Sequence, residues 1–146
     1  MSHQHPWCRS PIALIIAPTH ELCIQIEDQT KALAMKLPNI RTCLLIGGVP
    51  IPQQLYRLQG NVQVVVATPG RLNDIIENHC ERLNLKQVRM VVLDEVDTML
   101  QMGFEKQVSG DVSYFTINIV LVRKGNCIVV SFIVSYTIPS LNCRGV

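Results

Sequence analysis

Short runs of apolar residues alternate along the chain with segments in which apolar residues recur every three or four positions. The runs are rich in Ile, Val, Leu and Ala, and they predict buried strands at 12–17, 42–46, 62–67 and 88–93. The periodic segments predict helices at 21–37, 53–59 and 71–80. Strands that alternate with helices through short turns indicate an α/β fold with a parallel, doubly wound sheet.

The predicted helices are amphipathic, so each should pack one face on the sheet. In the first and longest of them, apolar residues align along one side over four turns. In the third, they occupy successive turns of a shorter segment. The residues expected to face the sheet are Leu22, Ile26, Leu33 and Leu37 in the first helix, and Leu72, Ile75 and Ile76 in the third.

The pattern changes after residue 108. Two β-branched and apolar runs, 112–122 and 127–138, are separated by Arg123-Lys124-Gly125-Asn126, which predicts a hairpin. Neither run is long enough for a membrane-spanning helix. The chain is therefore expected to divide into a polar leader (1–10), an α/β domain (11–108) and a hydrophobic, irregular β-prone tail (109–146).

Composition narrows the class of protein. A chain of 146 residues that is 48% hydrophobic and 16% charged is long and apolar enough for one folded domain, and this composition argues against disorder. The net charge of +2 is too small to indicate nucleic-acid binding, and residues 11–108 carry nine Lys and Arg against ten Asp and Glu. Any contact with RNA must therefore be local.

Six cysteines are present without the short spacing of a zinc site, and most lie within apolar runs. This usage favours buried, reduced thiols over zinc ligands or disulfides. The sequence shows neither a secretory signal nor a transmembrane span. We expect a nuclear or cytoplasmic protein that binds no membrane, and nothing in the sequence indicates a defined oligomer.

Two adjacent carboxylates, Asp94 and Glu95, directly follow the last predicted strand of the sheet, in the string Val91-Val92-Leu93-Asp94-Glu95-Val96-Asp97. A buried parallel strand delivers such acids to the active edge of an α/β sheet, and this is the Walker B pattern. In a phosphate-transfer ATPase the first acid holds magnesium, usually through water, and the second directs the attacking water. Taken alone, the string also fits an acidic loop that caps the next helix.

The order of further motifs decides between these alternatives. Three motifs precede the acids, in the order Pro18-Thr19-His20-Glu21-Leu22, Gly47-Gly48 and Thr68-Pro69-Gly70-Arg71. A further string, Met102-Gly103-Phe104, follows the acids. In this order the chain resembles the DEAD-box ATP-dependent RNA helicases. The three preceding motifs and the acids stand where that family has motifs Ia, GG, Ib and II, and the string after the acids is also typical of the family. The resemblance covers roughly residues 11–108, and within the family it points to the member with a zinc-finger HIT module.

The resemblance implies part of a RecA-like domain that uses ATP and Mg²⁺ and binds the RNA backbone without reading bases. The resemblance implies that Glu95 and Asp94 are catalytic and that Asp94 binds magnesium through water. It also implies that Asp94, Glu95 and Asp97 bind the nucleotide cofactor. Thr68 is placed to cap the following helix, so that free N–H groups beside Arg71 can hold phosphate. The residues assigned to RNA are Pro18, Thr19, Glu21, Gly47, Gly48, Thr68, Pro69, Gly70 and Arg71.

Three departures from the family pattern bear on activity. His20 stands where motif Ia of the family usually has arginine. A permanent cation is thereby replaced by histidine, a side chain that is mostly neutral near pH 7. Val96 replaces the small alanine of DEAD and changes the fit beside the nucleotide. No Gly-Lys dipeptide occurs in the chain, so the phosphate-binding loop and its strand are missing, and with them the sheet is expected to be incomplete.

The family's second RecA-like domain is also missing from these residues. We therefore interpret the chain as a fragment of a helicase that is inactive as an ATPase and does not bind ATP and Mg²⁺ tightly. The alternative is a non-enzymatic module that binds RNA backbone weakly or competes for a partner, or a non-functional truncated isoform.

Overall fold

The computed structural model describes residues 10–103, 116–124 and 127–135, and four parallel strands form its central sheet. All four predicted strands are present, together with the three predicted helices and a short fourth helix. The elements are β1 (Ala13–Ile16), α1 (His20–Ala34), β2 (Thr42–Leu45), α2 (Ile51–Leu58), β3 (Val64–Ala67), α3 (Pro69–Asn78), β4 (Met90–Leu93), α4 (Val96–Gln101), β5 (Thr116–Lys124) and β6 (Cys127–Ser135).

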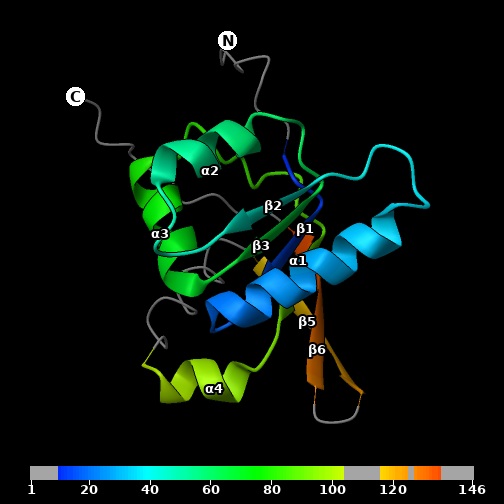
Figure 1. Ribbon diagram of the computed structural model, residues 1–146. Helices are drawn as coiled ribbons and strands as arrows, with labels where there is room; N and C mark the ends of the chain where they lie inside the picture. The colour runs from blue at the N-terminus through cyan, green and yellow to red at the C-terminus, as the bar shows by residue number, and fades with distance from the viewer. Residues whose placement is uncertain (1–9, 104–115, 125–126, 136–146) are drawn as a thin grey trace.

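The spatial order of the strands is β2-β3-β1-β4, which differs from their order along the chain (Figure 1). β1 lies in the middle and pairs in parallel with both β3 and β4. At the end of β1, Ile16 lies opposite Ala67 on one side and opposite Leu93 on the other. The carboxyl ends of the four strands therefore line up at one edge, and this edge carries the loops discussed below.

Helices cover both faces of the sheet, as expected for a doubly wound fold (Figure 1). Side chains alternate between faces along each strand: Leu14 and Ile16 join a core with α2, α3 and α4, whereas Ile15 and Ala17 face α1. The predicted inward residues of α3 are confirmed. Leu72, Ile75 and Ile76 are all buried in the larger core.

The first helix ends earlier than its apolar pattern predicts. α1 stops at Ala34, and Leu22 and Ile26 pack on the sheet. Leu33 and Leu37, however, are 76% and 58% exposed, so their predicted place on the packed face is wrong. A 15-residue helix is about 22 Å long and a four-residue strand about 13 Å, so the end of α1 runs past the sheet. No helix in the described ranges combines the length and apolar character that a bilayer crossing needs.

The predicted hairpin is confirmed by β5 and β6, which pair antiparallel from Thr116↔Ser135 to Lys124↔Cys127. The pairing is regular over nine residues of each strand. This part of the tail is therefore a regular hairpin, whereas the sequence predicted an irregular tail. Arg123 and Lys124 belong to β5 rather than to the turn. β5 and β6 form a sheet of their own, and β6 lies next to β4. The outer parts of both predicted runs, 112–115 and 136–138, lie outside the described residues.

Two of the cysteines match the expectation of buried thiols. Cys23 and Cys43 are free and fully buried, and burial raises the pKa of Cys23 to about 11 and that of Cys43 to about 12. The expectation is wrong for Cys80, which is disulfide-bonded. Disulfide formation depends on how closely two Cα atoms approach in the fold, and the spacing of cysteines along a sequence does not report that distance.

Candidate functional site

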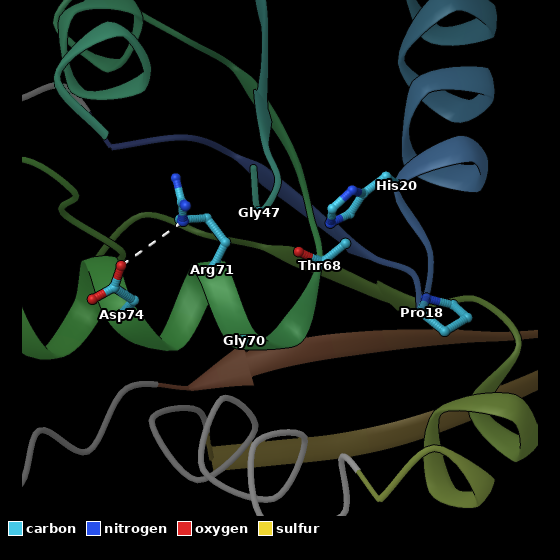
Figure 2. A pocket seen from close by; sticks show the side chains of 7 residues that line it. All are labelled: Pro18, His20, Gly47, Thr68, Gly70, Arg71 and Asp74. Atoms are coloured by element: carbon cyan, nitrogen blue, oxygen red, sulfur yellow. Dashed lines mark ion pairs between the residues drawn. The ribbon is translucent and has the colours of Figure 1, made fainter. Parts of the chain in front are cut away.

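A pocket of about 370 Å³ opens at the carboxyl ends of β1, β2 and β3 (Figure 2). Three loops that are distant in sequence build it, and each begins where one of these strands ends. Two backbone hydrogen bonds hold the loops together at their start: Ala17 N–H donates to Ala67 O (3.1 Å), and Thr68 N–H donates to Leu45 O (3.0 Å). The pocket is lined by Pro18, His20, Gly47, Thr68, Gly70, Arg71 and Asp74.

The two threonines that precede helices behave differently. Thr19 caps α1, because its Oγ1 accepts a hydrogen bond from Leu22 N–H at 3.3 Å. Thr68 occupies the same position before α3, with Pro69 in the first turn, but its hydroxyl makes no capping bond. The predicted cap by Thr68 is therefore wrong, and this buried side chain lines the pocket instead.

His20 lies against Gly47, the first glycine of the loop after β2 (Figure 2). A Cβ atom added to Gly47 would approach His20 Nε2 to 3.1 Å, which is tighter than ordinary contact. The next residue, Gly48, has φ = +74°, in the left-handed region that favours glycine. The first glycine thus makes room for the imidazole and the second allows the loop to turn.

Arg71 connects α3 to the loop after β2. Its Nη1 donates to Val49 O at 2.8 Å, and its Nε lies 3.8 Å from Asp74 Oδ2. The side chain is only 13% exposed. The sequence assigned Arg71 to RNA as a source of donors; in the structure one amino group of its guanidinium donates to a carbonyl, and its positive charge is partly balanced by Asp74.

The same loop is held from the other side by Gln54 of α2. Its Nε2 donates to Ile46 O at 2.8 Å and to Val49 O at 3.2 Å. Gln54 is 2% exposed, although it is polar. Sequence reasoning missed both Gln54 and Asp74. The available signals were a polar residue on the inward side of an amphipathic helix, and an acid three positions after Arg71 in a helix.

The acids after β4 form a separate part of the same edge. Asp94 N–H donates to Ile16 O at 2.9 Å, which places the acids beside the end of β1. Glu95 N–H donates to Asp94 Oδ1 at 3.0 Å, and Glu95 has φ = +51°, an uncommon conformation for a residue other than glycine. Asp97 lies in the first turn of α4. None of these three acids lines the 370 Å³ pocket.

The structure thus brings together five of the nine residues that the sequence assigned to RNA: Pro18, Gly47, Thr68, Gly70 and Arg71 line the pocket. The other four lie close by in the sequence but do not line it. Thr19 and Gly48 belong to the loops, whereas Glu21 and Pro69 belong to the first turns of α1 and α3.

Comparison with known proteins extends this picture. A sequence profile of the DEAD/DEAH box helicase family matches residues 4–132. Over 100 residues the chain is 56% identical to the human protein named probable ATP-dependent RNA helicase DDX59, a match that covers 68% of this chain and 16% of that protein. It is 48% identical over 100 residues to DEAD-box ATP-dependent RNA helicase 41 of Arabidopsis thaliana, with 68% and 19% covered. The chain spans less than a fifth of these curated relatives.

A solved structure has the same fold. The crystal structure of a DEAD box protein from the hyperthermophile Methanococcus jannaschii superposes with a TM-score of 0.65 and 39% identity, over 72% of this chain and 28% of that one. The parallel sheet is therefore RecA-like, as the resemblance implied. The family profile continues past residue 108 into β6, so the family signal does not end where the composition changes. Because the profile covers most of the chain and the fold agrees with it, this chain belongs to the DEAD/DEAH box helicase family.

Proposed function

We propose that this chain provides the RNA-backbone contacts and the acidic pair of a RecA-like domain in an ATP-dependent RNA helicase. The observation that carries this proposal is the convergence of three loops, from separate parts of the sequence, on one pocket at the carboxyl edge of the sheet. Ligands of open α/β sheets bind at this edge. The names of the relatives, which describe ATP-dependent RNA helicases, support the same function.

The pocket suits a sugar-phosphate backbone better than a base. α1 and α3 both begin at the loops that build it, and the first N–H groups of a helix attract phosphate without regard to sequence. Gly70 leaves the first turn of α3 open, since a Cβ atom there would meet nothing within 4 Å. Charge contributes modestly, because Arg71 is paired with Asp74. We infer binding that is weak and independent of base sequence.

Asp94 and Glu95 would serve the nucleotide. Bound Mg²⁺ would neutralise phosphate charge, and Asp94 would hold it through water at the end of β4. The hydrogen bond from Glu95 N–H orients Asp94, and Glu95 is exposed where it could direct a water molecule. Asp97 would act from the first turn of α4.

A second candidate is RNA binding without catalysis by the 146-residue polypeptide, with or without competition for a partner. The sequence contains no Gly-Lys dipeptide, so its own residues include no phosphate-wrapping loop. The pocket, in contrast, is built entirely from described residues of this chain. We therefore assign RNA-backbone contact to the chain itself and ATP hydrolysis to the whole helicase.

Fluorescence anisotropy with labelled single-stranded RNA tests this function. Oligonucleotides of equal length but different sequence should bind with similar, weak affinity that falls as salt is raised. Arg71→Met should weaken binding and reduce the salt slope by about 0.7, the contribution of one neutralised phosphate on a single strand. Arg82→Met is the matched control, because Arg82 is exposed and its side chain forms a surface ion pair with Glu81. Base-specific binding that survives high salt would contradict the proposal.

A further inference from the structure

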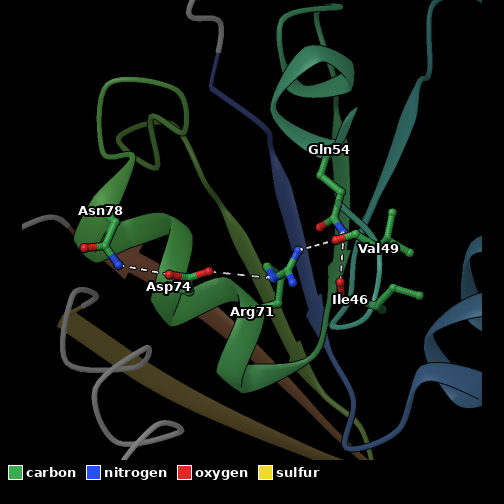
Figure 3. A network of polar contacts seen from close by, with 6 residues as sticks. All are labelled: Ile46, Val49, Gln54, Arg71, Asp74 and Asn78. Atoms are coloured by element: carbon green, nitrogen blue, oxygen red, sulfur yellow. Dashed lines mark hydrogen bonds and ion pairs between the residues drawn. The ribbon is translucent and has the colours of Figure 1, made fainter. Parts of the chain in front are cut away.

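We propose that Gln54 is a positioning residue that holds the Gly47-Gly48 loop in the shape that contacts the RNA backbone. This inference rests on the proposed function and extends it to a residue that does not line the RNA pocket. Gln54 would act through the loop rather than by touching RNA. Figure 3 shows its side chain reaching from α2 to the backbone of Ile46 and Val49, at the two ends of the loop.

Gln54 forms what we call a clamp, two hydrogen bonds from one side chain that hold both ends of the Gly47-Gly48 loop. One side-chain amide group, Nε2 of Gln54, donates to Ile46 O at 2.8 Å and to Val49 O at 3.2 Å. These two carbonyls bracket the glycine pair on both sides in the sequence. Since both bonds come from a single NH₂ group on a buried side chain, the distance between the two ends of the loop is set by α2.

A second set of contacts fixes the same loop from α3 (Figure 3). Val49 O also accepts a hydrogen bond from Arg71 Nη1 at 2.8 Å, so this carbonyl is shared by both helices. Arg71 is held by Asp74, and Asp74 Oδ1 accepts a hydrogen bond from Asn78 Nδ2 at 2.9 Å. These contacts connect α2 to α3 through the loop after β2. They therefore join the loops after β2 and β3, two of the three that build the pocket.

The loop needs such a clamp because its own residues do not restrain it. Two successive glycines have more conformational freedom than any other pair, and Gly48 is exposed with a positive φ of +74°. A loop that must present its backbone to phosphate binds more tightly when it is ordered in advance. The clamp supplies that order from outside the loop.

Gln54 is not a residue that stability alone would favour at this position. Within the described part of the chain, its buried Oε1 accepts no hydrogen bond, and burying an unpaired acceptor is unfavourable. An apolar side chain would avoid that cost, but it could not donate to Ile46 O and Val49 O. The contribution of Gln54 therefore lies in its two donated bonds.

The test compares Gln54→Met with Gln53→Met in the 146-residue chain. Methionine keeps the length of the side chain and removes both donated bonds, and Gln53 is the exposed neighbour in the same helix. Gln54→Glu is a second variant that keeps the shape and replaces the donor group with an acceptor. Each protein is assayed for amide hydrogen exchange in residues 46–49, for binding of labelled single-stranded RNA over a salt series, and for thermal unfolding.

We expect both Gln54 variants to speed amide exchange of Gly48 and Val49 selectively and to weaken RNA binding about fivefold. In Gln54→Met the salt slope should stay unchanged, because this variant neither removes a cation nor adds a charge; this separates loss of positioning from loss of Arg71. Gln53→Met should resemble the native chain. Unchanged loop exchange and RNA affinity in the Gln54 variants, or faster exchange spread evenly over the core, would overturn the proposal. If the native chain binds no RNA, the proposed function fails, while the exchange data still decide whether Gln54 clamps the loop.

Discussion

Arg71 Nη1 donates to Val49 O across 2.8 Å, so the helix after β3 is bonded to the loop after β2. β2 and β3 are neighbours in the sheet, and their loops therefore emerge side by side. The bond leaves Arg71 with fewer donors for a ligand, but it holds the remaining ones in place at the wall of the pocket. Arg71 thus has a structural as well as a binding role.

This double role predicts the effect of Arg71→Lys. A lysine ammonium is a single point charge and cannot reproduce the planar set of donors that reaches both Val49 O and Asp74. We expect a loss of about 1 kcal/mol in the free energy of unfolding, from one part-buried hydrogen bond, together with weaker RNA binding. Urea unfolding and RNA titration measure the two effects. Arg82→Lys, at an exposed ion pair, should change neither, and equal effects at both positions would contradict this account.

The glycines of the pocket allow stability and binding to be separated. Gly48→Ala should destabilise the fold by about 1 kcal/mol, because its φ of +74° is unfavourable for alanine. Gly70→Ala should leave stability unchanged or slightly higher, since Gly70 lies in α3 and a Cβ atom there meets nothing within 4 Å. The added methyl group would nevertheless stand at the pocket wall and weaken RNA binding. A Gly70→Ala chain with native RNA affinity would argue against RNA contact at this turn.

The 146-residue polypeptide should show negligible ATP turnover. Asp94 and Glu95 would reach a nucleotide through a metal ion and water, and the chain has no Gly-Lys phosphate loop to hold it. A phosphate-release assay on highly purified protein, with and without RNA, measures this. The matched variant is Glu95→Gln, which removes the carboxylate proposed to direct water. Turnover in the native chain that disappears in Glu95→Gln would show that the prediction is wrong.

Stability should fall as pH rises above 9. Burial, together with the negative charge of Glu27 in the case of Cys43, raises the thiol pKa of Cys23 to about 11 and of Cys43 to about 12, from an ordinary 9.0. Between pH 9 and these values the unfolded chain releases the thiol protons and the folded chain retains them, so alkali favours unfolding. Urea unfolding at pH 8 and pH 10 measures the change. Cys43→Ala should be less stable than the native chain at pH 8. It should lose less stability between the two pH values, because it lacks the Cys43 thiol and the other alkaline groups titrate equally in both proteins.

Local pattern was sufficient to predict the main elements. Each strand of the central sheet is a short apolar run, and the three longer helices show the predicted periodicity because both signals come from residues a few positions apart. The family could also be recognised from the sequence, since four ordered motifs stand before or after those strands. The error at Leu33 and Leu37 arose where periodicity continues but the sheet beneath it ends.

The sequence by itself thus determined the α/β class, the positions of the strands, and the set of loops that carry Pro18, Gly47, Thr68 and Asp94. Only the tertiary structure decided which loops are neighbours. The strand order β2-β3-β1-β4 puts three loops around one pocket and leaves the acids beside β1. It also decided that Arg71 bonds a carbonyl and that Gln54 clamps a loop. These contacts join residues far from one another along the chain or on separate elements, and their geometry depends on packing of the whole domain, which local pattern does not encode.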